Sequence, residues 1–253
     1  LHFVLVAAFL GTLNHFLYFL SGQSPIVALF CPVTESVWEH LILLFFTFLL
    51  FIANFFSKRY FAKLSAIVIF ILKLAELTYR YLYNNEKIFE LLPLHLCNIT
   101  LIFVIIMMLS GSKTLFQLCF YWSLGAIFAI ATPDVKYSFP NFMTLSFFTT
   151  HFYILFAVIY AYIFFKFRPT LWGYFTAFFV INLICLGVYF INDSLGTNYL
   201  YVNRVPDFSS PINYFGEWPY YIIVVELIYI ILTYLIYFPF KSRVVKFGKS
   251  KFY

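Results

Sequence analysis

Residues 170–191 read TLWGYFTAFFVINLICLGVYFI, a run without a single Asp, Glu, Lys, Arg or His. About 20 consecutive apolar residues are needed for a helix to cross the hydrocarbon core of a bilayer, so this run predicts a transmembrane helix. The whole chain of 253 residues has the same character, with 64% hydrophobic residues, 10% charged residues and a mean hydropathy of +0.92. A soluble domain is about 45–50% apolar and about 25% charged. The composition therefore excludes a soluble protein.

Continuous apolar runs, and not the short alternating runs of a β-barrel, predict an all-α helix bundle. Eight windows fit a span: residues 3–20, 36–56, 64–84, 91–110, 115–132, 144–165, 170–191 and 218–240. The first window has no small-residue cleavage site, so we expect a helix there and not a signal peptide. No soluble domain or linker interrupts the series. We therefore expect a single transmembrane domain over residues 1–253.

Lys and Arg are distributed unequally between alternate loops. With eight spans, 11 of them fall on the side of the two termini, and only Lys87, Lys136 and Arg204 fall on the opposite side. The positive-inside rule then predicts that both termini face the cytoplasm. The net charge of +6 is thereby concentrated near cytoplasmic lipid headgroups, and nucleic acid is not an expected partner.

Most other polar side chains gather at the outer ends of the predicted spans. They are Glu39 and His40 in the second span, Glu76 and Arg80 in the third, His95, Cys97 and Asn98 in the fourth, Asp134 after the fifth, His151 in the sixth, Asn198 and Arg204 in the last outer loop, and Trp218 at the eighth. Ionisable groups at membrane depth are costly and are usually functional. We therefore expect one outward-facing polar chamber above an apolar floor.

Part of this set also has a structural interpretation. Glu76 and Arg80 have the i,i+4 spacing that is typical of a salt bridge within a helix. Trp218 fits an aromatic belt at the outer interface, and His40 fits an interfacial residue in contact with headgroups. The four cysteines fall in four separate segments, which argues against a disulfide framework and against a zinc site built from cysteines.

Cys97 differs from the other cysteines in its position. Pro93 suits the first turn of a helix, so Cys97 is expected about one turn in, where the helix dipole favours the thiolate. His95 is two residues away and points to another face. His151 is expected at a comparable depth on the sixth span. A cysteine and a histidine with a carboxylate or amide that orients the ring form a typical nucleophile constellation.

Several motifs occur in an order that resembles a known family. They are Leu92-Pro93-Leu94-His95-Leu96-Cys97, Thr132-Pro133-Asp134 followed by Phe139-Pro140, His151 within a span, Asn198-Tyr199, and Gly216-x-Trp218-Pro219-Tyr220. Together they resemble the YwaF-like family of bacterial integral membrane proteins over roughly residues 64–240. That family is similar to the eukaryotic ether-phospholipid acyltransferase and, more distantly, to the androgen-induced hydrolases of fatty-acid esters. The resemblance implies a multi-pass protein of the bacterial plasma membrane.

The resemblance also implies acyl chemistry on lipids, with the nucleophile at Cys97 and the histidine at His151. Two positions depart from the family pattern, because Asn141 stands where His is frequent and Val205 stands where Lys is frequent. The first 50 residues depart from it as well. There, residues 32–40 (PVTESVWEH) resemble a motif of another family of small membrane proteins.

The leading hypothesis is a lipid acyltransferase or lipid esterase that needs no cofactor or metal. Cys97 attacks an ester carbonyl to form a thioester, and His151 removes the thiol proton. Asp134 or Asn98 orients an imidazole, and His95 or an amide donor stabilises the oxyanion. The residues expected to bind the phospholipid or another acyl lipid are Asn98, His40, Glu39, Asn198, Trp218 and Arg204.

Two alternatives stay open. A metal-dependent hydrolase would bind Zn²⁺ through His40, His95 and His151 with Glu39 or Asp134. No histidine pair has the i,i+4 spacing that would favour such a site. A transporter or lipid-binding protein without chemistry would have discontinuous helices and access from both sides. The apolar inner halves of the spans argue against it.

Overall fold

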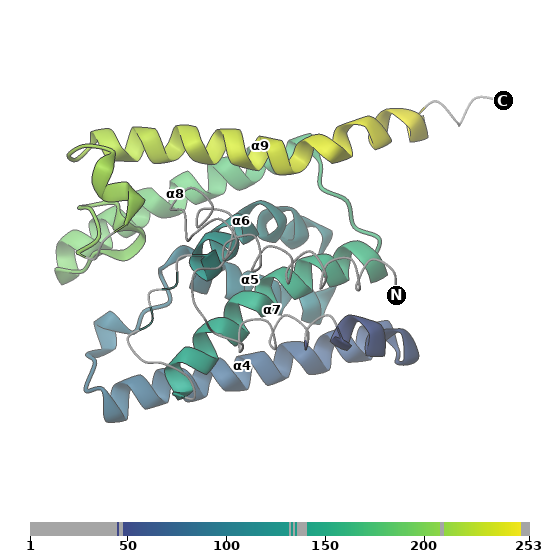
Figure 1. The fold of residues 1–253 in the computed structure, drawn as a ribbon, viewed down its shortest axis with the longest axis horizontal. Helices are drawn as coiled ribbons and strands as arrows, with labels where there is room; N and C mark the ends of the chain where they lie inside the picture. Colours follow the sequence, from purple (N-terminus) through teal and green to yellow (C-terminus); the bar gives the residue numbers. More distant parts are fainter. Residues whose placement is uncertain are drawn as a thin grey trace, which may run out of the picture.

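The computed structural model describes residues 45, 48–131, 133, 135, 141–207 and 210–248, and these are helical or loop, without a strand. The elements in chain order are η1 (Ala53–Phe55), α4 (Lys58–Tyr83), η2 (Ile88–Glu90), α5 (Leu96–Ser110), α6 (Lys113–Ala131), α7 (Phe142–Phe164), α8 (Leu171–Leu195), η3 (Tyr199–Tyr201), η4 (Pro211–Tyr214) and α9 (Tyr220–Gly248). Helices α4 to α7 pack together, and α8 and α9 lie side by side beyond α6 (Figure 1). The all-α prediction is confirmed for the described residues.

Four of the described helices are long and apolar enough to cross a membrane: α6, α7, α8 and the Tyr220–Lys241 part of α9. Helix α5 is apolar, but its 15 residues extend only about 22 Å, less than the roughly 30 Å of the hydrocarbon core. Helix α4 is long and carries several charged residues. The predicted span 3–20 and most of the span 36–56 lie outside the described residues. The total of eight spans and the cytoplasmic position of both termini therefore stay predictions.

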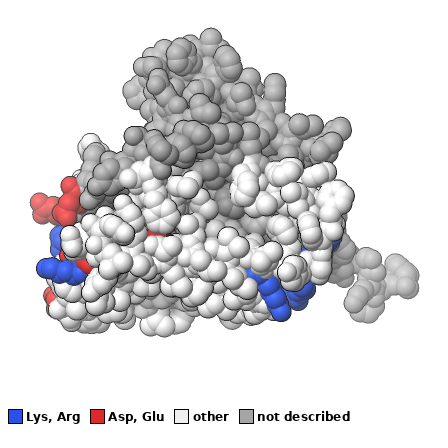
Figure 2. Space-filling model, turned by 90° about the horizontal axis from the view of Figure 1, so that it is seen from below, with Lys and Arg blue, Asp and Glu red and all other residues white. Residues whose placement is uncertain are grey.

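The helices alternate in direction (Figure 1), and most charged residues of the described chain fall near the helix ends, at two opposite ends of the molecule. One end, here called the basic end, carries Lys58, Arg59, Lys63, Lys113, Lys166 and Arg168, and no acidic residue among the described ones. The other, the mixed-charge end, carries Glu86, Lys87, Glu90, Asp193, Arg204, Asp207 and Glu217. Figure 2 shows blue groups without red at one side of the pale apolar body, and red beside blue at the other. The cytoplasmic position of the termini was predicted from this unequal distribution of Lys and Arg between the two ends.

Helix α4 begins six residues before its predicted window and α9 ends eight residues after its own. The difference that concerns the predicted site is the start of α5, which was expected at residue 91 and lies at Leu96. The N–H of Leu94 donates to the carbonyl of Leu92 (2.8 Å), and this tight turn keeps Pro93 out of the helix. The chain between α4 and α5 returns from the mixed-charge end into the bundle (Figure 1). The expectation that Cys97 lies one turn inside the helix was therefore wrong, because Cys97 is its second residue.

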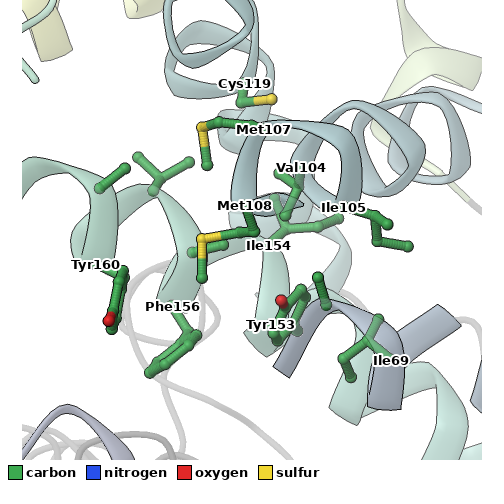
Figure 3. Close-up of a cluster of buried hydrophobic side chains, with 14 of the residues drawn as sticks. Ile69, Val104, Ile105, Met107, Met108, Cys119, Tyr153, Ile154, Phe156 and Tyr160 are labelled. Atoms are coloured by element: carbon green, nitrogen blue, oxygen red, sulfur yellow. The ribbon is translucent and has the colours of Figure 1, made fainter. Parts of the chain in front are cut away.

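Buried apolar side chains from four helices form the core of the α4–α7 group, and Figure 3 shows part of it. Ile69 of α4 and Ile105 of α5 lie near Tyr153 of α7, whose hydroxyl is 3.1 Å from the Ser65 hydroxyl of α4. Small residues, among them Ala62, Ala66, Ala157 and Ala161, are fully buried in this core. Such residues let helix backbones approach closely where lipid provides no hydrophobic driving force. A second cluster, around Trp122, joins α6 to α8 and α9 and includes Ile99 of α5.

The contact between α6 and α8 depends on a glycine. A Cβ added to Gly173 would lie 2.1 Å from Gln117 Oε1. Gln117 is held in place, because its Nε2 donates to the Arg168 carbonyl (2.9 Å) and its Oε1 accepts from the Thr170 N–H (2.9 Å). We expect Gly173→Ala to lower the free energy of unfolding by about 1–3 kcal/mol, measured by thermal unfolding in detergent. Gly187→Ala is the matched control on the same helix, because nothing lies within 4 Å of its added Cβ; equal effects of the two changes would contradict this packing.

Candidate functional site

A cluster of charged side chains lies inside the α4–α7 group. Glu76 on α4 is 6% exposed, and its carboxylate accepts hydrogen bonds from Lys73 Nζ (2.6 Å) and from the Ser146 hydroxyl of α7 (2.6 Å). The predicted Glu76–Arg80 salt bridge is present, but its N···O distance is 4.0 Å. Arg80 is closer to Glu86, to which its Nε and Nη2 donate at 2.9 and 2.5 Å.

Lys73 and Ser146 were missing from the predicted site. Lys73 had a detectable signal, because it is a charged residue one helical turn before Glu76 inside an apolar window. Ser146 had none, because its contact with Glu76 joins residues 70 positions apart in the sequence.

Cys97 faces the interior of the bundle. Its Sγ lies 4.0 Å from the position that a Cβ on Gly125 of α6 would take, and its side chain packs against the core of the α4–α7 group. Lys73 precedes the end of α4 at Tyr83 by ten residues, or about 15 Å along the helix. The Lys73 ammonium is nevertheless within electrostatic range of the Cys97 thiol. Helix α5 follows a loop that returns from the mixed-charge end into the bundle (Figure 1), in agreement with its short length.

His151 is held in one orientation by its own helix. Its Nδ1 lies 2.7 Å from the carbonyl oxygen of Phe147, and its ring centroid lies 4.2 Å from that of the Phe147 ring. A carbonyl can only accept a hydrogen bond, so the neutral imidazole carries its proton on Nδ1 and a lone pair on Nε2. Lys73 and Glu76 are both within electrostatic range of the ring. The structure contains no hydrogen bond between the side chains of Cys97 and His151, and both lie in the field of Lys73.

His95 occupies the N-cap position of α5 and does not cap the helix with its side chain. Its ring contacts the rings of Tyr199 and Tyr201, with centroid distances of 5.0 and 5.4 Å. The Tyr199 hydroxyl donates to the carbonyl of Phe89 (2.8 Å), which ties η3 to the loop that precedes α5. His95 thus lies between the start of α5 and the last loop of the mixed-charge end, within electrostatic range of Arg80 and Lys73.

Three residues predicted to bind substrate have contacts that order this last loop. Asn198 donates through Nδ2 to the Arg204 carbonyl (2.9 Å) and accepts from the Arg204 N–H (3.3 Å). Trp218 Nε1 donates to the Val202 carbonyl (3.1 Å). Buried Asn192 was not predicted as a site residue, and it binds both the N–H (2.8 Å) and the carbonyl (2.9 Å) of Tyr199. A role of Asn198, Arg204 and Trp218 in substrate binding stays a prediction.

Comparison with known proteins places this arrangement in a family. Residues 35–237 match the model of the TMEM164 family. The chain belongs to the TMEM164 family. No curated protein and no solved structure matches it. Family membership supports a membrane protein with several spans, whereas the resemblance to the YwaF-like family and to the acyltransferase stays a prediction.

The residues of the TMEM164-family match include several that the structure does not describe. Glu39, His40 and Asp134 lie outside the described residues, and Asn98 is the half-buried third residue of α5. Within the described part of the chain, no group of three or more His, Cys, Asp or Glu side chains is placed to hold a metal ion. The zinc alternative depends on His40 together with Glu39 or Asp134, so it also stays a prediction.

Proposed function

We propose that this TMEM164-family protein is a lipid acyltransferase or lipid esterase of the outer membrane leaflet, with Cys97 as nucleophile and His151 as general base. The observation that carries the proposal is the hydrogen bond from His151 Nδ1 to the Phe147 carbonyl (2.7 Å). It leaves the Nε2 lone pair free to accept a proton, and Lys73 is within electrostatic range of both the imidazole and the thiol of Cys97.

The reaction begins when Nε2 of His151 accepts the thiol proton of Cys97. The thiolate attacks the ester carbonyl of a lipid, and the C–O bond of the ester breaks as the thioester forms. The imidazolium returns its proton to the departing alkoxide, so an alcohol leaves. In the second half, His151 deprotonates water or an acceptor alcohol, which attacks the thioester and releases Cys97. If the acceptor is an alcohol, the product is a new ester and the protein is a transferase. If the acceptor is water, the product is a carboxylic acid and the protein is an esterase.

The surroundings of Cys97 suit the charges that develop. Its position at the second residue of α5 places it beside the first-turn N–H groups, which receive no side-chain cap from His95. These N–H groups and the helix dipole favour the oxyanion of the tetrahedral intermediate. His95 is a second candidate for the oxyanion, and Asn98 or Asp134 is proposed to orient an imidazole.

Cys97 and His151 need not be hydrogen-bonded before substrate arrives, because catalytic contacts often tighten only in the complex. The proposed substrate is a phospholipid or another acyl lipid. We propose that its polar part approaches through the mixed-charge end, past Asn198, Arg204 and Trp218, with Glu39 and His40 as further contacts.

Trapping of the thioester tests the proposal. Purified protein is incubated with a phospholipid that carries deuterated acyl chains and is then analysed by mass spectrometry. We expect one acyl adduct on Cys97 that hydroxylamine removes, and none on Cys119, whose side chain is fully buried. The Cys97→Ala variant should carry no adduct. Turnover of the lipid by that variant, or an adduct on another residue with Cys97 unmodified, would overturn the proposed nucleophile.

A further inference from the structure

A second polar group lies between α8 and α9. Glu226 is the only charged residue between Tyr220 and Phe240, and it lies about 9 Å along α9 from its start. Its half-buried carboxylate accepts one hydrogen bond, a long one, from Asn182 Nδ2 of α8 (3.4 Å) among the described residues. A carboxylate at this depth is costly unless it has good partners, and one long bond does not satisfy it.

Tyr229 lies one helical turn after Glu226, within its electrostatic range. Its hydroxyl is buried and meets the geometry of a hydrogen bond with no described residue, although the Trp122 indole lies close enough to interact with it. The indole Nε1 of Trp122, a neighbouring donor, is already bonded to the carbonyl of Ala177 (3.2 Å). The Phe178 ring of α8 stacks on the Tyr229 ring, with a centroid distance of 6.3 Å, and the Phe178 carbonyl accepts a hydrogen bond from Asn182 Nδ2 (3.1 Å). A buried hydroxyl without a partner is uncommon in native structures and points to a group that the structure does not contain.

We propose that Glu226, Tyr229 and Asn182 bind an uncharged lipid with a free hydroxyl group, of the diacylglycerol type. The lipid hydroxyl would donate to the carboxylate of Glu226 and accept from the phenol of Tyr229, which satisfies both groups at once. If Glu226 is protonated, the carbonyl oxygen of its carboxyl group would accept the same hydrogen bond from the lipid hydroxyl. The acyl chains would lie along apolar side chains that are exposed on both helices: Phe179, Leu183, Ile223 and Leu227.

The charge of this region selects against anionic lipids. From Leu171 to Phe240 the only cationic residue is Arg204, which lies in the last loop and not on α8 or α9. A phosphate at the depth of Glu226 would therefore meet a carboxylate without a cation to compensate it. The site shares no residue with the proposed acyl chemistry, so the inference does not rest on it.

Photolabelling tests the site in the full chain, reconstituted in phosphatidylcholine nanodiscs. The probe is a diacylglycerol with a diazirine in one acyl chain, and the labelled peptides are mapped by mass spectrometry. We expect labels on residues 171–195 and 220–240 that unlabelled diacylglycerol removes but its methyl ether does not. Glu226→Leu and Tyr229→Phe should each reduce labelling about fivefold or more, as the loss of one hydrogen bond predicts.

Tyr234→Phe is the matched control, because the Tyr234 hydroxyl accepts from Lys241 (3.4 Å) away from Glu226. It should label like the wild type, and so should Cys97→Ala, which separates this test from that of the proposed function. Glu226→Gln keeps the fold and a hydrogen-bond acceptor, and it should label more than Glu226→Leu. Labelling that is unchanged in both Glu226→Leu and Tyr229→Phe, or equal competition by the methyl ether, would overturn the site. A separate carboxyl-directed cross-linking experiment that joins Glu226 to residues 1–44 would also overturn the lipid site, because a segment of the chain would then occupy it.

Discussion

Replacement of Cys97 by Ala is expected to abolish acyl turnover, because the proposed reaction has no other nucleophile to form the thioester. His151→Ala is expected to slow the reaction by about 10²–10⁴-fold, the usual contribution of a general base. The rate of release of a labelled fatty acid or acyl product from phospholipid measures both effects. The double variant should be no slower than Cys97→Ala, because residues that act in one step are not additive.

Cys119→Ala is the matched control for the loss of a thiol. Cys119 is buried in the same core and lies on α6, outside the charged cluster. It should retain turnover, with at most a modest loss of stability from the small cavity. Normal turnover by His151→Ala would refute the general base, and a double variant that is much slower than Cys97→Ala would show that the two residues act in separate steps.

Replacement of Glu76 by Gln is expected to destabilise the protein by about 3–5 kcal/mol, the usual cost of leaving a buried charge without its partner. Glu76 accepts from both Lys73 and Ser146, so the variant leaves an ammonium at membrane depth without a carboxylate. Thermal unfolding in detergent measures the effect. Glu86→Gln is the matched control, because the Glu86 carboxylate is 27% exposed against 8% for Glu76, so loss of its charge should cost less.

The double variant Lys73→Met/Glu76→Leu sharpens this test. It removes both charges and should recover most of the stability that Glu76→Gln loses, because a buried ion pair is often replaceable by apolar residues of similar size. If Glu76→Gln kept full stability but lost turnover, the carboxylate would act in the reaction and the structural assignment would be wrong.

Features that depend on local composition could be predicted from the sequence. Helices α6 and α7 begin and end within about two residues of their predicted windows, because each apolar run stops where the chain becomes polar or contains Gly or Pro. Helix α8 ends at the left-handed Gly196 (φ +67°), four residues beyond its predicted window. The prediction counted apolar residues only, so it left out the polar last turn of the helix.

The candidate site could be predicted only as a set of residue types at one end of the bundle. The sequence alone predicted that Cys97 and His151 lie at comparable depth in the fourth and sixth spans, and that ionisable groups in apolar windows need partners. It also indicated an unequal distribution of Lys and Arg between the two ends. These features could be predicted because charge and hydropathy are properties of single residues and their near neighbours.

Tertiary structure alone decided where α5 begins and which groups meet inside the bundle. The loop before α5 is held by Tyr199, 110 residues from its partner Phe89, and the carboxylate of Glu76 is held by Ser146. Contacts of this kind depend on how the helices pack, and no local pattern encodes them. The same packing turns the thiol of Cys97 toward α6 and leaves the Tyr229 hydroxyl without the geometry of a hydrogen bond to any described residue.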